Sequence, residues 1–367
     1  MAEKSAPILI LAGDVGGTNT NLALVEYRGG RLEILKAGRY PTKAQSSIIL
    51  PLSRFLDKAA EIPGFRKPDV CCISGAGMVE DGSIALTNAP WTIVSKEIEE
   101  RFSFPTVLIN DFTALSYAVV ILDPEDPSKI IKVPHVDGRS PGPGYGMALV
   151  VGAGTGLGVG FVNRKADGSC LAFPSEGGHS EASAFDSLSW SLIRWVRDRC
   201  GWEPGIELFA SGQGIATIFR FLCSPCFDPS LAQGYETWGK SNVHLLPSEE
   251  ALLAMGEEDL PAAVALGADS LPRCALAMEI FLNFYARKVS SLACAFLPSG
   301  GIYLAGGISS KNQGLILQGR RFMKIFERNY APHMRAFLEN VPVFLVKDYS
   351  ISLLGAANAA VQMGGIR

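Results

Sequence analysis

Two turns along the chain combine glycine with residues that could contact a phosphate. The first is Gly13-Asp14-Val15-Gly16-Gly17-Thr18-Asn19. Glycine lets backbone N–H groups approach phosphate oxygens closely, and Thr18 and Asn19 add side-chain donors. Asp14 adds a carboxylate, which suits Mg²⁺ held through water. A plain hairpin turn can have the same composition, so this turn alone leaves phosphate binding and a simple connection equally open.

The second turn strengthens the case for phosphate binding. It reads Gly152-Ala153-Gly154-Thr155-Gly156-Leu157-Gly158. Two turns of this kind can grip a triphosphate from both sides. The chain has no G-x-x-x-x-G-K-[ST] motif, so it is not a P-loop protein. The residues after Gly158 favour a strand, whereas a dinucleotide site requires a helix there.

Three further groups could carry chemistry. Asn110-Asp111 follows a short apolar run, and it could either cap a helix or face a ligand at the end of a strand. Glu176-Gly177-Gly178-His179 places a carboxylate and an imidazole close together. A lone histidine more often packs or caps, but the two glycines favour a loop that faces a ligand. Gly306-Gly307 follows an apolar run and could form a strand-to-helix turn with or without a ligand.

The hydrophobic pattern predicts the elements that position these groups. The first part of the chain reads as strands at 8–12, 21–27, 31–40, 69–74 and 107–109, with helices from about 47, at 95–102 with Ser95 as N-cap, and at 112–122. A Pro- and Gly-rich stretch then marks a domain crossing at 123–146. The strand–turn–strand pattern restarts at 147–151 and 159–163, a weak internal duplication that indicates two lobes. Later helices are expected at 184–199, 212–222, 248–255, 274–295 and 353–363, with strands at 302–305 and 341–346.

Composition bounds the class of protein. The chain has 367 residues, of which 48% are hydrophobic and 19% charged, and its net charge is -3. That balance suits a globular protein of about two domains and argues against a nucleic-acid partner. No apolar window is long enough to span a bilayer, so we expect no membrane partner and a cytoplasmic location. Cys223 and Cys226 form a lone C-x-x-C without the second ligand pair that a zinc site needs.

The motifs, taken together and in order, carry a family resemblance. LAGDVGGTNTNLALV, LINDFTALSYAV, VVGAGTGLGVGFV, FPSEGGHSEA, ELFASG and IYLAGGIS resemble segments of bacterial-type glucokinases of the hexokinase group. These enzymes belong to the actin, sugar-kinase and Hsp70 superfamily. The resemblance implies a two-lobed α/β actin-like ATPase (RNase H-like) fold, each lobe a mixed sheet flanked by helices, with a ligand cleft between. We expect a small lobe of 1–122 plus 351–367 and a large lobe of 123–350.

The resemblance also implies an activity and a sugar site. The activity is ATP-dependent phosphorylation of glucose at the 6-hydroxyl, giving glucose 6-phosphate and ADP. Asp111 is then the catalytic base that takes the proton of that hydroxyl. Asn110, Asp111, Glu176, His179 and Glu207 are the expected contacts to the sugar. Glu207 could instead be an exposed glutamate at a helix start.

The resemblance implies ATP and Mg²⁺ as cofactors, with the metal at Asp14, and a homodimer as the assembly. The expected nucleotide contacts are Gly13, Asp14, Gly16, Gly17, Thr18, Asn19, Gly154, Thr155, Gly156, Gly306 and Gly307. No cysteine-rich motif lies near His179, so we expect none of the structural zinc that repressor-type sugar kinases carry.

Other functions on the same fold remain open. One alternative is a catalytically silent sugar sensor or repressor; the first strand begins close to residue 8, so we expect no DNA-binding segment before it. A second is an actin-like filament or chaperone ATPase, which would have no use for the Glu176–His179 cluster. A third is a kinase for another hexose, because Ser175 and the segment 180–182 depart from the usual family pattern.

Overall fold

The computed structural model describes residues 6–87, 89–239, 244–347 and 351–364. The chain divides into two compact units. The first unit comprises Met1–Asp123, Gly160–Pro174 and Asp348–Arg367, and the second comprises Pro124–Val159 and Ser175–Lys347. Residues 160–174, which the sequence predicts in the larger lobe, cluster with the first unit in the structure. The boundary at 351 expected from sequence adjoins residues outside the described ranges.

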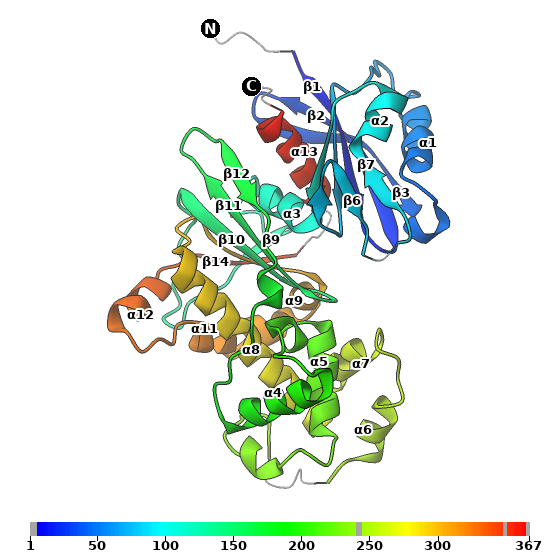
Figure 1. The fold of residues 1–367 in the computed structure, drawn as a ribbon. Coiled ribbons are helices and arrows are strands. Elements are labelled where there is room, and N and C mark those ends of the chain that lie inside the picture. The colour runs from blue at the N-terminus through cyan, green and yellow to red at the C-terminus, as the bar shows by residue number, and fades with distance from the viewer. Residues whose placement is uncertain (1–5, 88, 240–243, 348–350, 365–367) are drawn as a thin grey trace. The chain divides into compact units, whose positions relative to one another are not determined.

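The first unit is built on a five-stranded sheet in the order β3-β2-β1-β4-β8 (Figure 1). Its strands are β1 (Ile8–Val15), β2 (Asn19–Arg28), β3 (Arg31–Pro41), β4 (Val70–Gly75) and β8 (Thr106–Asn110). β1 and β2 are antiparallel, as are β2 and β3, whereas β4 and β8 run parallel to β1. The parallel strands therefore bring their carboxyl ends to one edge of the sheet.

Helices cover both faces of this sheet (Figure 1). α1 (Ile49–Ala59) and α2 (Ser95–Phe102) lie on one face, and α3 (Asp111–Val119) and α13 (Ile351–Met363) on the other. The alternation along β1 explains this arrangement. Leu9 and Leu11 belong to the apolar cluster that contains Phe55 of α1, and Ile10 and Ala12 to the cluster that contains α13. A strand buried on both faces reads as a continuous apolar run, as here.

Shorter elements complete the first unit. β5 (Val79–Glu80), β6 (Ser83–Ala85) and β7 (Thr92–Val94) form a small antiparallel sheet. The part of β11 (Leu157–Arg164) that lies in this unit pairs antiparallel with β12 (Cys170–Phe173). A single turn of 3₁₀ helix, η1 (Thr42–Ala44), follows β3.

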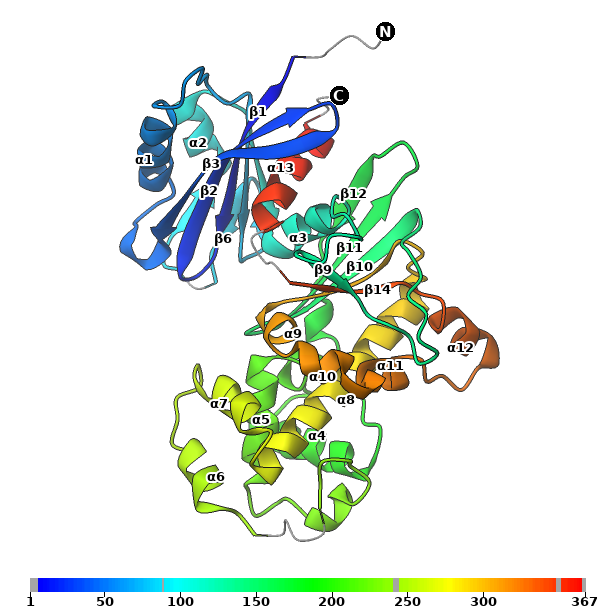
Figure 2. The same ribbon diagram turned by 180° about the vertical axis from the view of Figure 1, so that it is seen from behind.

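In the second unit, β10 (Gly146–Ala153), β13 (Gly301–Ala305) and β14 (Val343–Val346) run parallel, and β9 (Ile130–Lys132) pairs antiparallel with β14. The long helix α8 (Pro272–Phe296) packs against α5 (Gly212–Leu222), α7 (Leu260–Gly267) and α11 (Arg321–Phe326) (Figure 2). Proline at its first position and a left-handed Leu297 after its last residue mark its two ends.

The remaining helices of the second unit are mostly short. They are α4 (Ser187–Cys200), α5 (Gly212–Leu222), α6 (Pro247–Leu252), α7 (Leu260–Gly267), α9 (Gly307–Lys311), α10 (Gln313–Leu317), α11 (Arg321–Phe326) and α12 (Pro332–Leu338). Single 3₁₀ turns occur at η2 (Gly177–His179), η3 (Ile206–Leu208), η4 (Pro229–Ala232) and η5 (Gln318–Arg320).

The structure confirms the strands and longer helices expected from sequence, with shifted ends. One capping assignment was wrong. Val94, not Ser95, is the N-cap of α2, and the Ser95 hydroxyl donates to the Gly82 carbonyl. In the part of the chain that the structure describes, no helix combines the length and apolarity needed to cross a membrane.

Candidate active site

Asp14 lies near the carboxyl end of β1, between two neighbouring strands. It stands opposite Asn21 on β2 and Ser74 on β4. One carboxylate oxygen accepts from the Ser74 hydroxyl (3.2 Å), and the other from the Ser352 hydroxyl of α13 (2.8 Å). Burial raises the pKa of Asp14 above its ordinary value, although hydrogen bonds from Ser352, Ser74 and Asn21 act in the opposite direction. The carboxylate is therefore oriented by hydroxyls on two other elements.

The first glycine turn connects β1 to β2. The Gly16 N–H donates to the Asn19 carbonyl (2.9 Å), which closes the turn and leaves Gly17 and Thr18 at its tip. Thr18 is exposed. Gly13 is buried inside β1, and a Cβ there would come within 2.5 Å of the Ile73 side chain. Gly13 therefore serves the packing of the sheet, and Gly17 and Thr18 are the residues best placed to meet a ligand.

Asn110 and Asp111 join β8 to α3. The Asn110 side chain accepts from the Phe112 N–H (2.9 Å) and donates to the Gly77 carbonyl (3.1 Å). Asn110 is thus the N-cap of α3, which was one of the two roles left open by the sequence. An oxygen of Asp111 also accepts from the Phe112 N–H (2.9 Å). These bonds fix the backbone that carries Asp111.

The negative charge of Asp14 affects the ionisation of Asp111. The pKa of Asp111 is raised to about 6, chiefly by burial, with a further contribution from the negative charge of Asp14. Hydrogen bonds from Phe112 and Asn110 limit the rise. A cation beside this pair would relieve the repulsion, and hard carboxylate oxygens are the ligands that Mg²⁺ prefers. The donor set therefore fits a magnesium ion that completes its shell with water and phosphate.

The second glycine turn connects β10 to β11 and is held from two sides. The Gly154 N–H donates to the Gly156 carbonyl (2.9 Å), and the Gly154 carbonyl accepts from the Gly212 N–H at the start of α5 (2.8 Å). Gly306, after β13, has a φ of 91°, and a Cβ there would lie 2.3 Å from the Ala153 carbonyl oxygen. Only glycine allows this approach. The turn, the first residue of α5 and Gly306 are therefore neighbours.

Glu207 lies under the same turn. Its carboxylate accepts from the Leu157 N–H (2.8 Å). A Cβ on Gly156 would come within 2.5 Å of that carboxylate. Glu207 sits in η3, followed by Ser211, whose hydroxyl donates to the Glu207 carbonyl (2.7 Å) and caps α5. Glu207 is half-buried and bonded, so it is not the exposed helix-start glutamate that the sequence left open.

The Glu176–His179 segment packs against the carbonyl of the same residue, Leu157. A Cβ on Gly178 would lie 1.9 Å from the Leu157 carbonyl oxygen, so Gly178 lets the loop approach β11. The side chains of Glu176 and His179 are both exposed, with 3.6 Å between a carboxylate oxygen and the imidazole Nε2. The Ile206 N–H donates to the Ser180 carbonyl (2.8 Å), which ties this segment to η3. The second unit thus gathers all three of its expected sugar residues around Leu157.

Sequence reasoning missed several residues that complete these groups. Ser74 and Ser352 orient Asp14, and the Lys288 ammonium of α8 donates to the Ser180 hydroxyl beside His179. Burial lowers the pKa of Lys288. Ser352 is 338 positions from Asp14. No local pattern marks a partner that distant; only the packing of α13 on the sheet reveals it.

The structure assigns no special chemistry to the C-x-x-C pair. Cys223 and Cys226 are free thiols, and burial raises the pKa of Cys223 to about 12. A thiol with so high a pKa is a poor nucleophile and a poor metal ligand at neutral pH. Within the described ranges, no group of three or more His, Cys, Asp and Glu side chains could hold a metal ion. Mg²⁺ does not need such a cage, because it usually keeps waters and binds phosphate.

Solved structures share this fold. A glucokinase from an Antarctic psychrotroph superimposes with a TM-score of 0.74 at 24% identity, covering 96% of this chain and 98% of that one. A ROK family glucokinase from Streptomyces griseus, solved in complex with glucose and AMPPNP, gives a TM-score of 0.57 at 20% identity over 96% of this chain and 99% of that one. The chain therefore has the actin-like α/β fold of these sugar kinases.

Comparison of sequences finds relatives with higher identity than these solved structures. A glucokinase of a Nostoc species is 31% identical over 361 residues, which is 97% of this chain and 99% of that protein. A glucokinase of a Synechocystis species is also 31% identical, over 96% of this chain and 98% of that protein. The family model described as Glucokinase matches residues 11–363, which include every candidate site residue discussed above. The chain belongs to the glucokinase family.

Proposed function

We propose that this protein transfers the γ-phosphoryl group of Mg-ATP to the 6-hydroxyl of glucose, with Asp111 as the catalytic base. Membership of the family makes it an ATP-dependent glucose-phosphorylating enzyme. The observation that carries the assignment of the base is Asp111 itself, a carboxyl at the carboxyl end of β8 with a pKa raised to about 6. Such a group is ionised at neutral pH yet more basic than an ordinary aspartate.

The chemistry needs little covalent help. The glucose O6 attacks the γ-phosphorus while the bond from that phosphorus to the β,γ-bridging oxygen breaks, which releases ADP. Asp111 accepts the proton of the 6-hydroxyl and orients that hydroxyl toward the phosphorus. Asn110 fixes the start of α3 and so holds the Asp111 backbone in place. In this proposal Asn110 also contacts the sugar through its amide nitrogen, which donates to the Gly77 carbonyl in this structure.

The other sugar contacts come from the second unit. The exposed carboxylate of Glu176 and imidazole of His179 suit a sugar, whose neighbouring hydroxyls each donate and accept. One oxygen of Glu207 accepts from Leu157, which leaves its second oxygen available for a hydroxyl. We propose that these three residues and Asp111 serve the same glucose molecule.

ATP is held by the glycine turns in this proposal. Gly17, Thr18 and Asn19 serve the phosphates from the first unit, and Gly154, Thr155 and Gly156 from the second. Gly306 and Gly307 lie beside the second turn, where a flat adenosine could lie against backbone. Asp14 holds Mg²⁺, which neutralises phosphate charge when bound. Gly13 and Gly16 support the first turn through packing and its closing hydrogen bond.

Two finer points complete the proposal. We propose a homodimer, supported by the resemblance and by a nearly fully exposed Tyr330 in the second unit. Sedimentation equilibrium would test this, with twice 39.2 kDa expected. We also propose a cytoplasmic location, since that compartment supplies ATP.

A coupled assay of ADP release tests the function directly. Protein, Mg-ATP and one sugar are combined across a panel of glucose, mannose, fructose and glucosamine. We expect the largest kcat/KM with glucose and a sugar-independent ATPase that is orders of magnitude slower. ADP release that does not depend on sugar would overturn the proposal in favour of a chaperone-like ATPase. Glucose binding without ADP release would instead indicate a silent sensor.

A further inference from the structure

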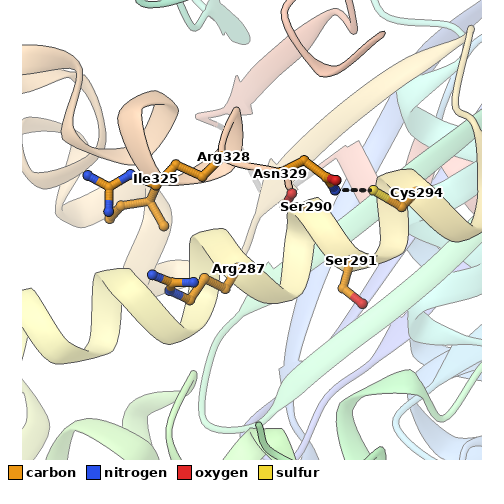
Figure 3. Close-up of a pocket in the computed structure, with 7 residues that line it drawn as sticks. All are labelled: Arg287, Ser290, Ser291, Cys294, Ile325, Arg328 and Asn329. Atoms are coloured by element: carbon orange, nitrogen blue, oxygen red, sulfur yellow. Dashed lines mark hydrogen bonds between the residues drawn. The ribbon is translucent and has the colours of Figure 1, made fainter. Parts of the chain in front are cut away.

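A hollow lies entirely within the second unit, beside α8. Arg287, Ser290, Ser291 and Cys294 line it from one side. Their spacing puts them on a single face of the helix. Ile325 of α11, together with Arg328 and Asn329 just after it, lines the opposite side (Figure 3). The hollow has a volume of about 310 Å³.

This hollow meets a larger one. Arg287, Ile325 and Arg328 line both, and the larger has a volume of about 590 Å³. Its other lining residues include Phe185, Tyr235 and Lys324. These sizes are typical of sites for small molecules. None of the residues proposed for glucose or ATP lines either hollow.

The acidic side chains of the larger hollow already have partners. Asp186 accepts from the Ser189 N–H (2.7 Å) and from the Tyr235 hydroxyl (2.7 Å). Glu279 accepts from the backbone of Glu236 and from Thr237. Glu236 pairs with Arg321 at 3.2 Å. Of these three carboxylates, Glu236 is paired with a cation, whereas Asp186 and Glu279 are held in place by hydrogen bonds from neutral donors.

The basic side chains of the two hollows have fewer partners. Across the described ranges, neither Lys324 nor Arg328 has a side-chain hydrogen bond or ion pair. Arg287 stacks its guanidinium over the Phe185 ring (4.5 Å to the centroid), and its buried Nε has no hydrogen-bond partner. Burial and the nearby positive charge of Arg328 both lower the pKa of Arg287. The negative charge of Asp186 acts in the opposite direction on that pKa. In the part of the chain that the structure describes, however, no carboxylate forms an ion pair with Arg287, Lys324 or Arg328, although all three line the hollows.

We propose that this hollow binds a small molecule through a phosphate monoester or free phosphate group, held by Arg287 and Arg328. Guanidinium groups match phosphate oxygens in pairs, which is why arginine recurs in phosphate sites. Lys324 adds a further charge in the larger hollow. Ser291 and Asn329, whose amide also donates to the Cys294 Sγ, line the smaller one. The ligand satisfies the Arg287 Nε and relieves the repulsion between the two arginines. This proposal does not depend on which sugar the enzyme phosphorylates.

Thermal unfolding tests the proposal without using activity. The wild-type protein is titrated with inorganic phosphate, with glucose 6-phosphate, and with NaCl at matched ionic strength. Both phosphates should raise Tm beyond the NaCl control. In Arg287→Ala/Arg328→Ala the apparent affinity for inorganic phosphate should fall by about tenfold or more, as expected for the loss of charge-assisted hydrogen bonds. Lys96→Ala/Arg101→Ala, which removes two exposed charges from α2, is the matched control and should respond like wild type.

A second variant guards against a general loss of stability. Arg328→Gln removes a charge whose side chain has no partner, so it should fold normally and still weaken phosphate binding several-fold. Glucose alone should raise Tm equally in every variant, which separates this site from the sugar site. A larger loss of affinity for glucose 6-phosphate than for inorganic phosphate in the arginine variants would identify a sugar phosphate as the ligand of the hollow, and the reverse would identify free phosphate. Equal phosphate effects in wild type and both arginine variants, or none beyond NaCl, would overturn the proposal.

Discussion

The Glu207 carboxylate accepts a hydrogen bond from the Leu157 N–H at 2.8 Å, so a proposed sugar ligand supports the turn proposed to bind phosphate. The carboxylate lies so close to Gly156 that a side chain at that position would collide with it. The carbonyl of the same residue, Leu157, is approached by Gly178. The sugar loop and Glu207 therefore both contact the backbone of Leu157 in the phosphate turn, the loop at its carbonyl and the carboxylate through its N–H.

Glu207→Ala should consequently weaken both substrates. It removes a sugar contact and leaves the Leu157 N–H without its partner, at ~1–3 kcal/mol for a buried donor. We expect the KM for ATP and the KM for glucose each to rise by roughly tenfold, since 1.4 kcal/mol corresponds to tenfold. If Glu207 were a sugar contact alone, as the family resemblance implies, its loss would raise mainly the KM for glucose. Steady-state kinetics with each substrate varied in turn will distinguish the two expectations.

His179→Ala is the matched comparison. The imidazole is exposed and touches only Glu176 among the candidate site residues. We expect kcat/KM for glucose to fall about tenfold to 150-fold, as for one lost partner of a sugar hydroxyl. The KM for ATP should stay close to wild type. An equal rise in both KM values for His179→Ala would mean that the loop, rather than the side chain, had been damaged.

Asp111→Ala should lower kcat by roughly 10²–10⁴, the usual contribution of a positioned acid-base group. Glucose should still bind, because other residues hold it; tryptophan fluorescence or calorimetry can check this. A variant that keeps more than about a tenth of the wild-type kcat would remove Asp111 from the role of base.

The raised pKa of Asp111 predicts a pH dependence. A base acts only when deprotonated, so activity should be full above the pKa and be lost as the pH falls through about 6. An ordinary aspartate would titrate about two units lower. The measurement is kcat/KM for glucose from about pH 5 to 8. The residual activity of Asp111→Asn should lack this limb; an identical profile in the variant would assign the ionisation to ATP or another group.

Asp14→Asn should raise the Mg²⁺ concentration needed for half-maximal activity by roughly tenfold, equivalent to ~1.4 kcal/mol of binding. The amide keeps the size of the side chain; its oxygen can accept from one serine hydroxyl and its NH2 group can donate to the other, so the fold should persist. Removal of the negative charge should also lower the pKa of Asp111. Kinase titrations with Mg²⁺ and pH profiles measure both effects, and unchanged Mg²⁺ dependence would exclude Asp14 as the metal ligand.

Gly306→Ala and Gly307→Ala form a pair of neighbouring substitutions with opposite expectations. Gly306 has a positive φ and lies against the Ala153 carbonyl, so alanine there should cost at least about 1–3 kcal/mol of stability. Gly307 has open space around it, so alanine there should be tolerated. Chemical unfolding of both variants tests this. If Gly306→Ala lost no more stability than Gly307→Ala, the strain at Gly306 would have to be relieved by backbone movement.

The sequence predicted best where one local pattern determines the structure. The strands beside both glycine turns were recognised because an apolar run ends at residues with special backbone freedom, as β1 does before Gly16. The short helices between 307 and 338 were missed, since five to seven residues carry too little periodicity. β5 to β7 were missed for the same reason.

Site residues followed the same division. Asp14, Asp111 and His179 stand in motifs and could be named from sequence. Their surroundings could not, because Ser352 reaches Asp14, and Lys288 reaches Ser180 beside His179, only through tertiary packing. The bond from Leu157 to Glu207 spans 50 positions and has no sequence signal. Sequence thus names the candidate reacting groups, and folding determines which side chains bond to them.

The packing of α13 on the first unit has a consequence for synthesis on the ribosome. The Asn358 amide donates to the Tyr117 carbonyl of α3 (2.9 Å), and Gly355 lies directly against Ala114. The first unit therefore lacks one covering layer, and Asp14 lacks Ser352, until residues 351–363 have emerged. Over most of translation, the sheet that carries Asp14 and Asp111 exposes an apolar face. The unit whose synthesis begins first is thus completed last, and during that interval it is the part of the nascent chain most in need of a chaperone.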